Sequence, residues 1–299
     1  MRQQEELTTQ MQLAKEALLA FAANSSSIYS NERGPGFFPC PDKTNSGAAD
    51  ADCDSSSVNL GRLPEYVDVE DNKLFFNSYY SDTSGQFWYA VAPNYVYSAA
   101  NENSRRAQNR TSVDSLVSAN RLTLDGTGDV VALIIAPGEP LAFQNRTAGL
   151  LAVNFLEGEN VGSDLNFSSG NGATTDTFND RVIAITHNDV MQFIGMKAAT
   201  EIKRLLDEDY ESQSEPRHYP GDPVTSLQTA DEFHADFASV MTSNPWLTDD
   251  PAGNKEQWAT DILYTLLLET EASIQFKGCP NMSFKLVYGG GITPTGKFC

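Results

Sequence analysis

The residues best suited to chemistry are carboxylates in an acidic loop near residue 50. Asp50, Asp52 and Asp54 alternate along the chain, and Asp42 lies a short way upstream. Alternating carboxylates are typical of the first half of an EF-hand loop, whose oxygen atoms bind calcium. The pattern then departs from that loop, since Ser55 stands where its turn glycine belongs. These four aspartates are candidate calcium ligands, and a solvated loop tied by a disulfide is the simpler interpretation.

Four cysteines form two local pairs, Cys40 with Cys53 and Cys279 with Cys299. Neither pair has the C-x-x-C spacing of zinc or redox sites. An even number of locally paired cysteines favours structural disulfides formed in an oxidising compartment. Other connectivities are formally open, and we expect the sequential pairing because it closes the shortest loops.

Sequence motifs of common enzyme classes are absent. The histidines His187, His218 and His234 lack metal-binding spacing, and no nucleophile elbow, Walker A loop or dinucleotide fingerprint occurs. Because the chain has 40 acidic residues, a hydrolase with paired carboxylates stays an alternative. The sequence favours a protein that is not an enzyme and that needs no cofactor other than the calcium considered above.

The overall charge argues against one class of partner. The 299-residue chain carries 40 acidic and 20 basic residues, a formal net charge of −20. Nucleic acids and anionic lipid headgroups are bound by clustered Lys and Arg, so an acidic surface repels both. Nucleic acid is therefore not an expected partner.

The pattern of apolar residues predicts a mixture of helices and strands. Residues 5–23 predict an amphipathic helix with one apolar stripe, which the polar run at 24–27 should end. The continuous apolar run at 129–136 predicts a buried central strand. A second helix is expected at 186–211, beginning with a capping box, and a closing strand at 283–288. The fold class indicated is α+β.

Two lobes are expected. Residues 212–224 contain three prolines and predict a linker or surface loop. This boundary gives a first lobe at 24–211, which holds the disulfide loop, and a second, smaller α+β lobe at 225–299. Residues 1–23 supply the N-terminal helix.

The sequence shows no route for export. No stretch reaches the ~18–20 apolar residues of a membrane span, and the N-terminus lacks the apolar core of a signal peptide. A chain with disulfides nevertheless has to reach an oxidising compartment. We therefore expect Met1 to be an artificial start, with a leader or membrane segment removed.

Several short motifs together resemble one family. They are AKEALLAFAAN (14–24), GFFPCPD (36–42), GRLP (61–64), FWYAVAP (87–93), VALIIAPGEPLAFQNR (131–146), NFLEGEN (154–160) and NDRVIAITHNDVM (179–191). The chain resembles large pilin-like proteins with a prepilin-type cleavage and methylation segment, which are relatives of type II secretion pseudopilins and type IV minor pilins. The tidy Asp-x-Asn-Gly-Asp-Gly run of the family is missing, which puts calcium binding by this chain in doubt.

The resemblance implies a pilin-like fold, in which the N-terminal amphipathic helix packs on an antiparallel sheet. That helix would continue from a membrane helix missing here. Implied partners are other pilins or pseudopilins, contacted through the helix, and an inner-membrane assembly platform. The implied location is a periplasmic domain anchored in the inner membrane, or the outside of the cell on a bacterial pilus. Because the head is large, a minor, initiating or tip subunit is expected.

Two alternatives belong to other functional classes. The first is a tip adhesin or an extracellular head that binds glycans through aromatic side chains, with Trp88, Tyr89 and Tyr95 as candidate ligand contacts. The second is a secreted acidic hydrolase. Glycan binding that depends on Trp88 would favour the first, and a cleft with two carboxylates at catalytic separation would favour the second.

Overall fold

The chain folds into two compact units. The computed structural model describes residues 2–29, 35–51, 53, 57–69, 72–76, 85–96, 121–162, 164–170, 175–220, 247, 262–276 and 279–296. Unit 1 comprises residues 1–22, 37–102 and 116–187, and unit 2 comprises residues 23–36, 103–115 and 188–299. Helices combine with mainly antiparallel sheets, so the predicted α+β class is confirmed.

Helix α1 (Arg2–Tyr29) is longer than predicted. It passes through the serine run that should have ended it, and Ser25 in that run is fully buried. Burial and packing outweigh the weak helix propensity of serine at such a position. Most of the predicted apolar stripe is buried, namely Met11, Ala14, Leu18 and Phe21. Leu7, the first member of the stripe, is only partly buried.

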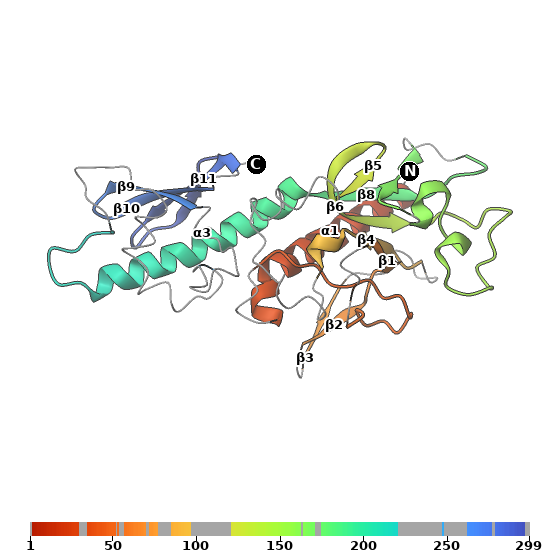
Figure 1. The fold of residues 1–299 in the computed structure, drawn as a ribbon, viewed down its shortest axis with the longest axis horizontal. Coiled ribbons are helices and arrows are strands. Elements are labelled where there is room, and N and C mark those ends of the chain that lie inside the picture. The colour runs from red at the N-terminus through yellow and green to blue at the C-terminus, as the bar shows by residue number, and fades with distance from the viewer. Residues whose placement is uncertain are drawn as a thin grey trace. The chain divides into compact units, whose positions relative to one another are not determined.

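The centre of unit 1 is a six-stranded sheet in the order β1–β4–β6–β5–β7, with β8 also paired with β6 (Figure 1). The strands are β1 (Asn59–Arg62), β4 (Trp88–Val91), β5 (Leu122–Leu124), β6 (Thr127–Ala136), β7 (Asn166–Phe167) and β8 (Arg181–Thr186). All pairs are antiparallel except β5 with β7. Strand β6 is buried from Val130 to Ala136, so the predicted central strand is confirmed.

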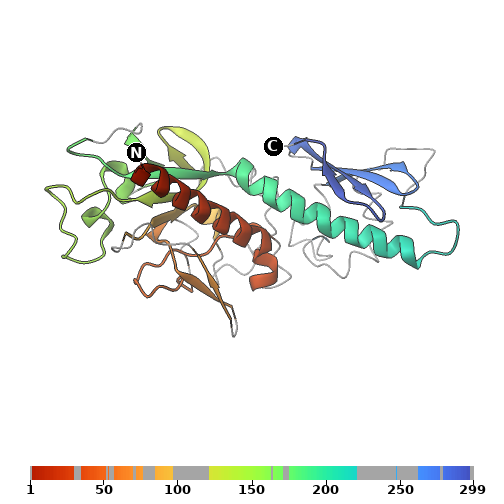
Figure 2. The same ribbon diagram turned by 180° about the vertical axis from the view of Figure 1, so that it is seen from behind.

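Helix α1 contacts this sheet within unit 1. Figure 2 shows α1 running alongside the sheet, and Lys15 Nζ donates a hydrogen bond to the carbonyl oxygen of Ala184 in β8, at 2.8 Å. The ring of Phe21 packs against that of Phe76, with centroids 5.5 Å apart. Phe76 directly follows a two-stranded hairpin of β2 (Tyr66–Val69) and β3 (Asn72–Phe75). The described part of the unit also contains the short 3₁₀ helices η2 (Pro93–Tyr95), η4 (Ala152–Asn154) and η5 (Gly158–Val161).

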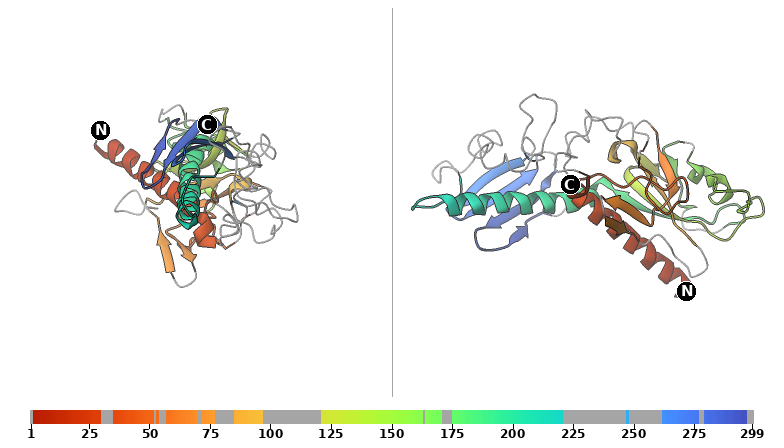
Figure 3. Two further views of the ribbon diagram at one scale, coloured as in Figure 1. Left: turned by 90° about the vertical axis from the view of Figure 1, so that its left-hand side faces the viewer. Right: turned by 90° about the horizontal axis from the view of Figure 1, so that it is seen from below.

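In the described part of residues 188–299, unit 2 packs a helix against a sheet. Helix α3 (His187–Ser212) begins one residue after the start and ends one residue after the end of the helix predicted at 186–211. The sheet has the order β12–β11–β10–β9, all antiparallel (Figure 3, right). Its strands are β9 (Ile262–Leu268), β10 (Glu271–Phe276), β11 (Cys279–Val287) and β12 (Ile292–Pro294).

The side chains of this sheet alternate between buried and half-buried, as expected when one face is covered. Helix α3 covers it closely at Gly195, where an added Cβ would lie 2.6 Å from Met282 Sδ. A small residue is therefore required at this point of the helix. The closing strand predicted at 283–288 lies within β11 apart from its last residue.

The segment at 212–224 is predicted to be a linker or surface loop, but its described part, up to residue 220, packs against the rest of unit 2. Tyr219 is fully buried, and its backbone N–H donates to the Glu269 carbonyl at 2.7 Å. The Tyr264 hydroxyl donates to the Pro220 carbonyl at 2.9 Å. These contacts hold residues up to 220 against β9, and the last of the several boundaries between the two units falls between His187 and Asn188. In the part of the chain described, no helix is both long and apolar enough to span a membrane.

Candidate functional site

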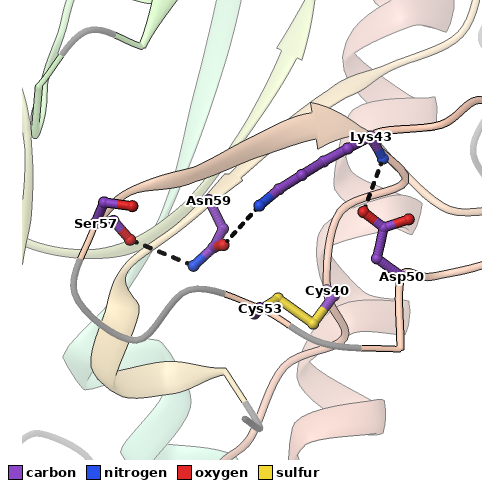
Figure 4. The surroundings of a disulfide bond; sticks show 6 residues. All are labelled: Cys40, Lys43, Asp50, Cys53, Ser57 and Asn59. Atoms are coloured by element: carbon purple, nitrogen blue, oxygen red, sulfur yellow. Dashed lines mark hydrogen bonds between the residues drawn. A yellow bond between two sulfur atoms is a disulfide. The ribbon is translucent and has the colours of Figure 1, made fainter. Parts of the chain in front are cut away.

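The predicted disulfide loop forms the first part of the candidate site. Cys40 and Cys53 are joined with a Cα–Cα distance of 5.8 Å, and both residues are buried (Figure 4). The expected pairing is confirmed for these two cysteines. Cys279 is disulfide-bonded as well, and Cys299, its predicted partner, lies outside the described residues.

Asp42 organises the turn that follows it. The residue is 1% exposed, and its carboxylate accepts hydrogen bonds from the backbone N–H groups of Thr44 (3.1 Å), Ser46 (3.1 Å) and Gly47 (2.7 Å). The Thr44 hydroxyl donates to it as well, at 3.2 Å. Donors of this kind stabilise a buried carboxylate. The protein itself therefore satisfies the oxygens that calcium would need.

The other predicted calcium ligands are placed only in part. Asp50 Oδ2 accepts a hydrogen bond from the Lys43 backbone N–H at 3.3 Å (Figure 4). Burial raises the pKa of Asp50, against the opposing effect of that N–H. Asp52 and Asp54 lie outside the described residues. Among the residues described, no three His, Cys, Asp or Glu side chains are grouped to hold a metal ion, and calcium binding stays a prediction.

The three predicted ligand-contact aromatics belong to the interior. Tyr89 and Tyr95 are at most 1% exposed, and Trp88 is 3% exposed. Strand β4 is buried along its whole length, because it lies inside the sheet between β1 and β6. Tyr89 and Tyr95 therefore present no face on the surface to a glycan. Trp88 borders a cavity formed by described residues of unit 1.

That cavity has a volume of about 370 Å³ and lies beside the disulfide loop within unit 1. It is lined by Asp42, Lys43, Asn45, Val58, Leu60, Gly61, Arg62, Trp88, Leu150, Leu151, Ala152, Val161 and Gly162. Among the described residues that line it there is no histidine, cysteine, serine or threonine, so these residues supply no nucleophile activated by a base. The described lining combines cationic and apolar side chains, which are better suited to binding another group than to acid–base catalysis.

Arg62 fixes one wall of the cavity. Its guanidinium carbon lies 4.6 Å from the centre of the Trp88 ring and 4.2 Å from that of Phe155. Arg62 Nη1 also donates to the Gln86 carbonyl at 3.1 Å. Cation–π contacts of this kind are strongest when the charge is desolvated, and Arg62 is 8% exposed. The stack ties β1 and β4 to the loop that contains Phe155.

A second cluster, which the sequence did not predict, lies on the other side of Phe155. Arg146 places its guanidinium carbon 5.5 Å from the Phe155 ring, and its Nη2 donates to the Gly138 carbonyl at 2.5 Å. Gln144 Nε2 donates to Glu157 Oε1 at 2.6 Å. Glu157 and Asp180 are both buried and lie together. Single residues in a sequence give no signal for such a pair.

The cluster nevertheless joins segments that carry the family resemblance. Arg146 and Gln144 come from the motif at 131–146, Glu157 from that at 154–160, and Asp180 from that at 179–191. Motifs that are separate in the sequence thus meet at one buried point. We use the name carboxyl cluster for Gln144, Glu157, Asn160 and Asp180.

Comparisons with known proteins give no relative for the chain. No family model matches it, and no curated protein and no solved structure is significantly similar to it. The resemblance to pilin-like proteins therefore rests on the sequence motifs alone. Any function for the chain has to be argued from its own residues and their geometry.

Proposed function

We propose that the chain is a non-enzymatic minor pilin or pseudopilin subunit. It would take part in the assembly, initiation or tip of a type IV pilus or a type II secretion pseudopilus. The single observation that carries the proposal is that helix α1 has one side buried by the chain itself and another side exposed. This observation is combined with the motifs that resemble the family.

One side of α1 is used by the chain itself. Ala14 and Leu18 are fully buried, and Lys15 is bonded to β8. The buried stripe begins only at Met11, whereas Glu5 and Glu6 are exposed and Leu7 is partly so. A helix that is buried in its later turns and open in its first turns suits a subunit whose helix start contacts neighbouring subunits.

The other side of α1 offers a second contact. Leu13 is 51% exposed, whereas Ala14 and Leu18 of the same helix are fully buried. Leu7 and Leu13 would meet other pilins or pseudopilins in this proposal. Upstream, a membrane helix would deliver the subunit to the inner-membrane assembly platform.

The disulfide and the acidic composition support an exported location. Structural disulfides form outside the reducing cytosol, and the Cys40–Cys53 bridge is buried. We place the described part in the periplasm, anchored to the inner membrane, or outside the cell on a pilus. A head of 299 residues is bulky for a repeating subunit, which favours a minor position.

The geometry of the site gives less support to the two alternatives, a glycan-binding adhesin and a hydrolase. Glycan binding by surface aromatics would need exposed rings, and Tyr89 and Tyr95 are buried. A hydrolase would need two carboxylates at a cleft, whereas the described residues lining the cavity include a single one, Asp42, whose oxygens accept several hydrogen bonds. Neither alternative has an observation that favours it over a subunit role.

Site-specific photo-crosslinking in the native bacterium would test the proposal. A photoreactive phenylalanine would replace Leu13 in the full-length gene product, and Asp164, on an exposed loop of the same unit, would be the control position. We expect Leu13 to crosslink to other pilin-like subunits and Asp164 not to. A plain cleavable signal peptide in the full-length product, together with no crosslink from Leu13, would refute the subunit role.

A further inference from the structure

The inference concerns the two buried acids of the carboxyl cluster. Glu157 is 1% exposed and Asp180 is 4% exposed. Burying one carboxylate is costly unless it is paired with a cation, bound to a metal or protonated, and burying two together is more so. Within the described part of the chain, neither acid forms an ion pair with a lysine or arginine. Something other than a salt bridge must balance their charge.

The side chain of each acid accepts a hydrogen bond from the backbone of the other. The Glu157 N–H donates to Asp180 Oδ2 at 3.0 Å, and the Asp180 N–H donates to Glu157 Oε2 at 3.0 Å. The Asn179 N–H donates to Glu157 Oε2 as well, at 3.1 Å. These reciprocal bonds join the residue before η5 to the residue before β8. The geometry is that of a clasp between two loops distant in sequence.

Neutral amides surround the pair. Asn160 Nδ2 donates to Asp180 Oδ2 at 3.0 Å, and Gln144 Nε2 donates to Glu157 Oε1. Asp180 Oδ1 is buried and receives no hydrogen bond from a donor in the described residues. The two carboxyl groups lie close together, because each accepts a hydrogen bond from the backbone N–H of the other residue. Two adjacent buried carboxyl groups cannot both ionise without strong repulsion, so one of them is expected to keep a proton.

The charged groups around the pair leave room for only one negative charge. Arg146 lies beyond Gln144, with its Nη2 3.5 Å from Gln144 Oε1, so its charge reaches Glu157 through a neutral amide. Glu139 and Glu159 are exposed, and Arg181 is partly exposed. One ionised acid and one protonated acid match this environment. Burial, with a smaller contribution from Glu157, raises the pKa of Asp180 to about 8, which agrees with that arrangement.

We propose that Glu157 and Asp180 form a pH-sensitive clasp, in which one proton kept by the buried pair lets their reciprocal bonds hold the segment around η5 against the start of β8. The proton resides on Asp180. When it is lost, two adjacent negative charges are buried together and the segment loosens.

The clasp also supports one wall of the cavity. Glu157 is the residue before η5, and Val161 and Gly162, at the other end of η5, line the cavity. Gly162 adopts a left-handed conformation with φ 74°, and an added Cβ there would lie 2.3 Å from Leu60 Cδ2. Loosening η5 would therefore move the cavity wall away from β1. The cavity would keep its shape only while the proton is bound.

The sign of the pH effect follows from linkage. Asp180 has a folded pKa above its ordinary value of 3.8, so the folded protein keeps a proton that the unfolded chain releases. Its contribution to stability is complete below about pH 4, and it is lost as the pH rises through about 8. Above that pH the loss is complete and the curve levels off.

The test uses the whole chain and one isosteric variant. Asp180→Asn mimics the protonated acid, since its amide carries no charge and its oxygen can accept the same bonds from Glu157 N–H and Asn160. Asp164→Asn, at an exposed carboxylate, is the matched control. We expect the melting temperature of the wild type to fall relative to Asp180→Asn between about pH 5 and about pH 9, while Asp164→Asn follows the wild type.

Parallel melting curves for all three proteins over that range would overturn the clasp. A second measurement does not depend on a variant that folds. Titration of the Asp180 side-chain carboxyl by carbon-detected NMR on the wild type should give a midpoint well above the ordinary acidic range. A midpoint within that range would also overturn it. The clasp does not depend on the proposed role as a pilin-like subunit.

Discussion

The Tyr95 hydroxyl and His187 Nδ1 share a hydrogen bond of 2.9 Å in the interior of unit 1. Tyr95 ends the short helix η2, and His187 is the first residue of α3. Both side chains are buried, with their rings in an edge-on contact at 6.4 Å. The pair therefore fixes the point at which β8 turns into α3.

Replacing Tyr95 by phenylalanine should destabilise the protein by about 1–3 kcal/mol, because a buried nitrogen loses its partner while the ring packing is kept. Urea unfolding at neutral pH measures this difference. Tyr66→Phe is the matched control, since Tyr66 is only partly buried and its ring would keep its contacts with Lys73 and Phe75. Equal losses for the two variants would show that the Tyr95–His187 bond adds no stability.

The Cys40–Cys53 disulfide should stabilise the protein by restricting the conformations of the unfolded chain. Its ends are separated by 13 residues, and closing a loop of that size corresponds to about 3 kcal/mol in the chain-entropy model. The double variant Cys40→Ala, Cys53→Ala should lose roughly this much in urea unfolding. Thiol titration of the unfolded, unreduced wild type should detect no thiol. Two or more reactive thiols would contradict the disulfide.

Gly61 should tolerate no side chain. An added Cβ would lie 2.8 Å from the Asp42 carbonyl oxygen and 2.9 Å from Pro41 Cβ, and the first of these is backbone that cannot move aside. Gly61→Ala should therefore cost about 1–3 kcal/mol. Gly128→Ala is the control, because nothing lies within 4 Å of its added Cβ, and it should stay within about 0.5 kcal/mol of the wild type. Similar losses at both positions would refute the close approach of β1 to the disulfide loop.

The elements with a strong local signal could be predicted from the sequence. The run at 129–136 has apolar residues throughout its second half, and only a strand buried on both faces accommodates such a run. The two helices also had clear periodicity. The end of α1 could not be predicted, since Ser25 is fully buried in the fold while its own propensity opposes the helix.

The site was predictable only where neighbours in sequence are neighbours in space. The Cys40–Cys53 pairing and the turn at Asp42 are local, so spacing indicates them. Spacing could not reveal that Asp42 is satisfied by its own turn and not by a metal. The contact of Glu157 with Asp180 spans 23 residues of sequence, and its chemistry depends on burial that no local pattern encodes.

The last prediction concerns alkaline pH and Tyr219 in unit 2. Its hydroxyl donates to Asp207 Oδ1 at 2.5 Å, and Asp207 Oδ2 lies 2.5 Å from Lys203 Nζ. Burial, followed by the bond to Asp207, raises the pKa of Tyr219 above its ordinary value of 10.0. The folded protein therefore keeps the phenolic proton where the unfolded chain releases it, and stability is lost as the pH rises above about 10.

Tyr219→Phe removes this proton, so the variant should lose stability relative to the wild type at neutral pH but approach it above about pH 10. Urea unfolding at both pH values measures the gap. Asp207→Asn keeps an acceptor for the hydroxyl while removing the charge, and it should let Tyr219 ionise at a lower pH than in the wild type. A gap between wild type and Tyr219→Phe that stays constant with pH would mean that the Tyr219 phenol does not keep its proton in the fold.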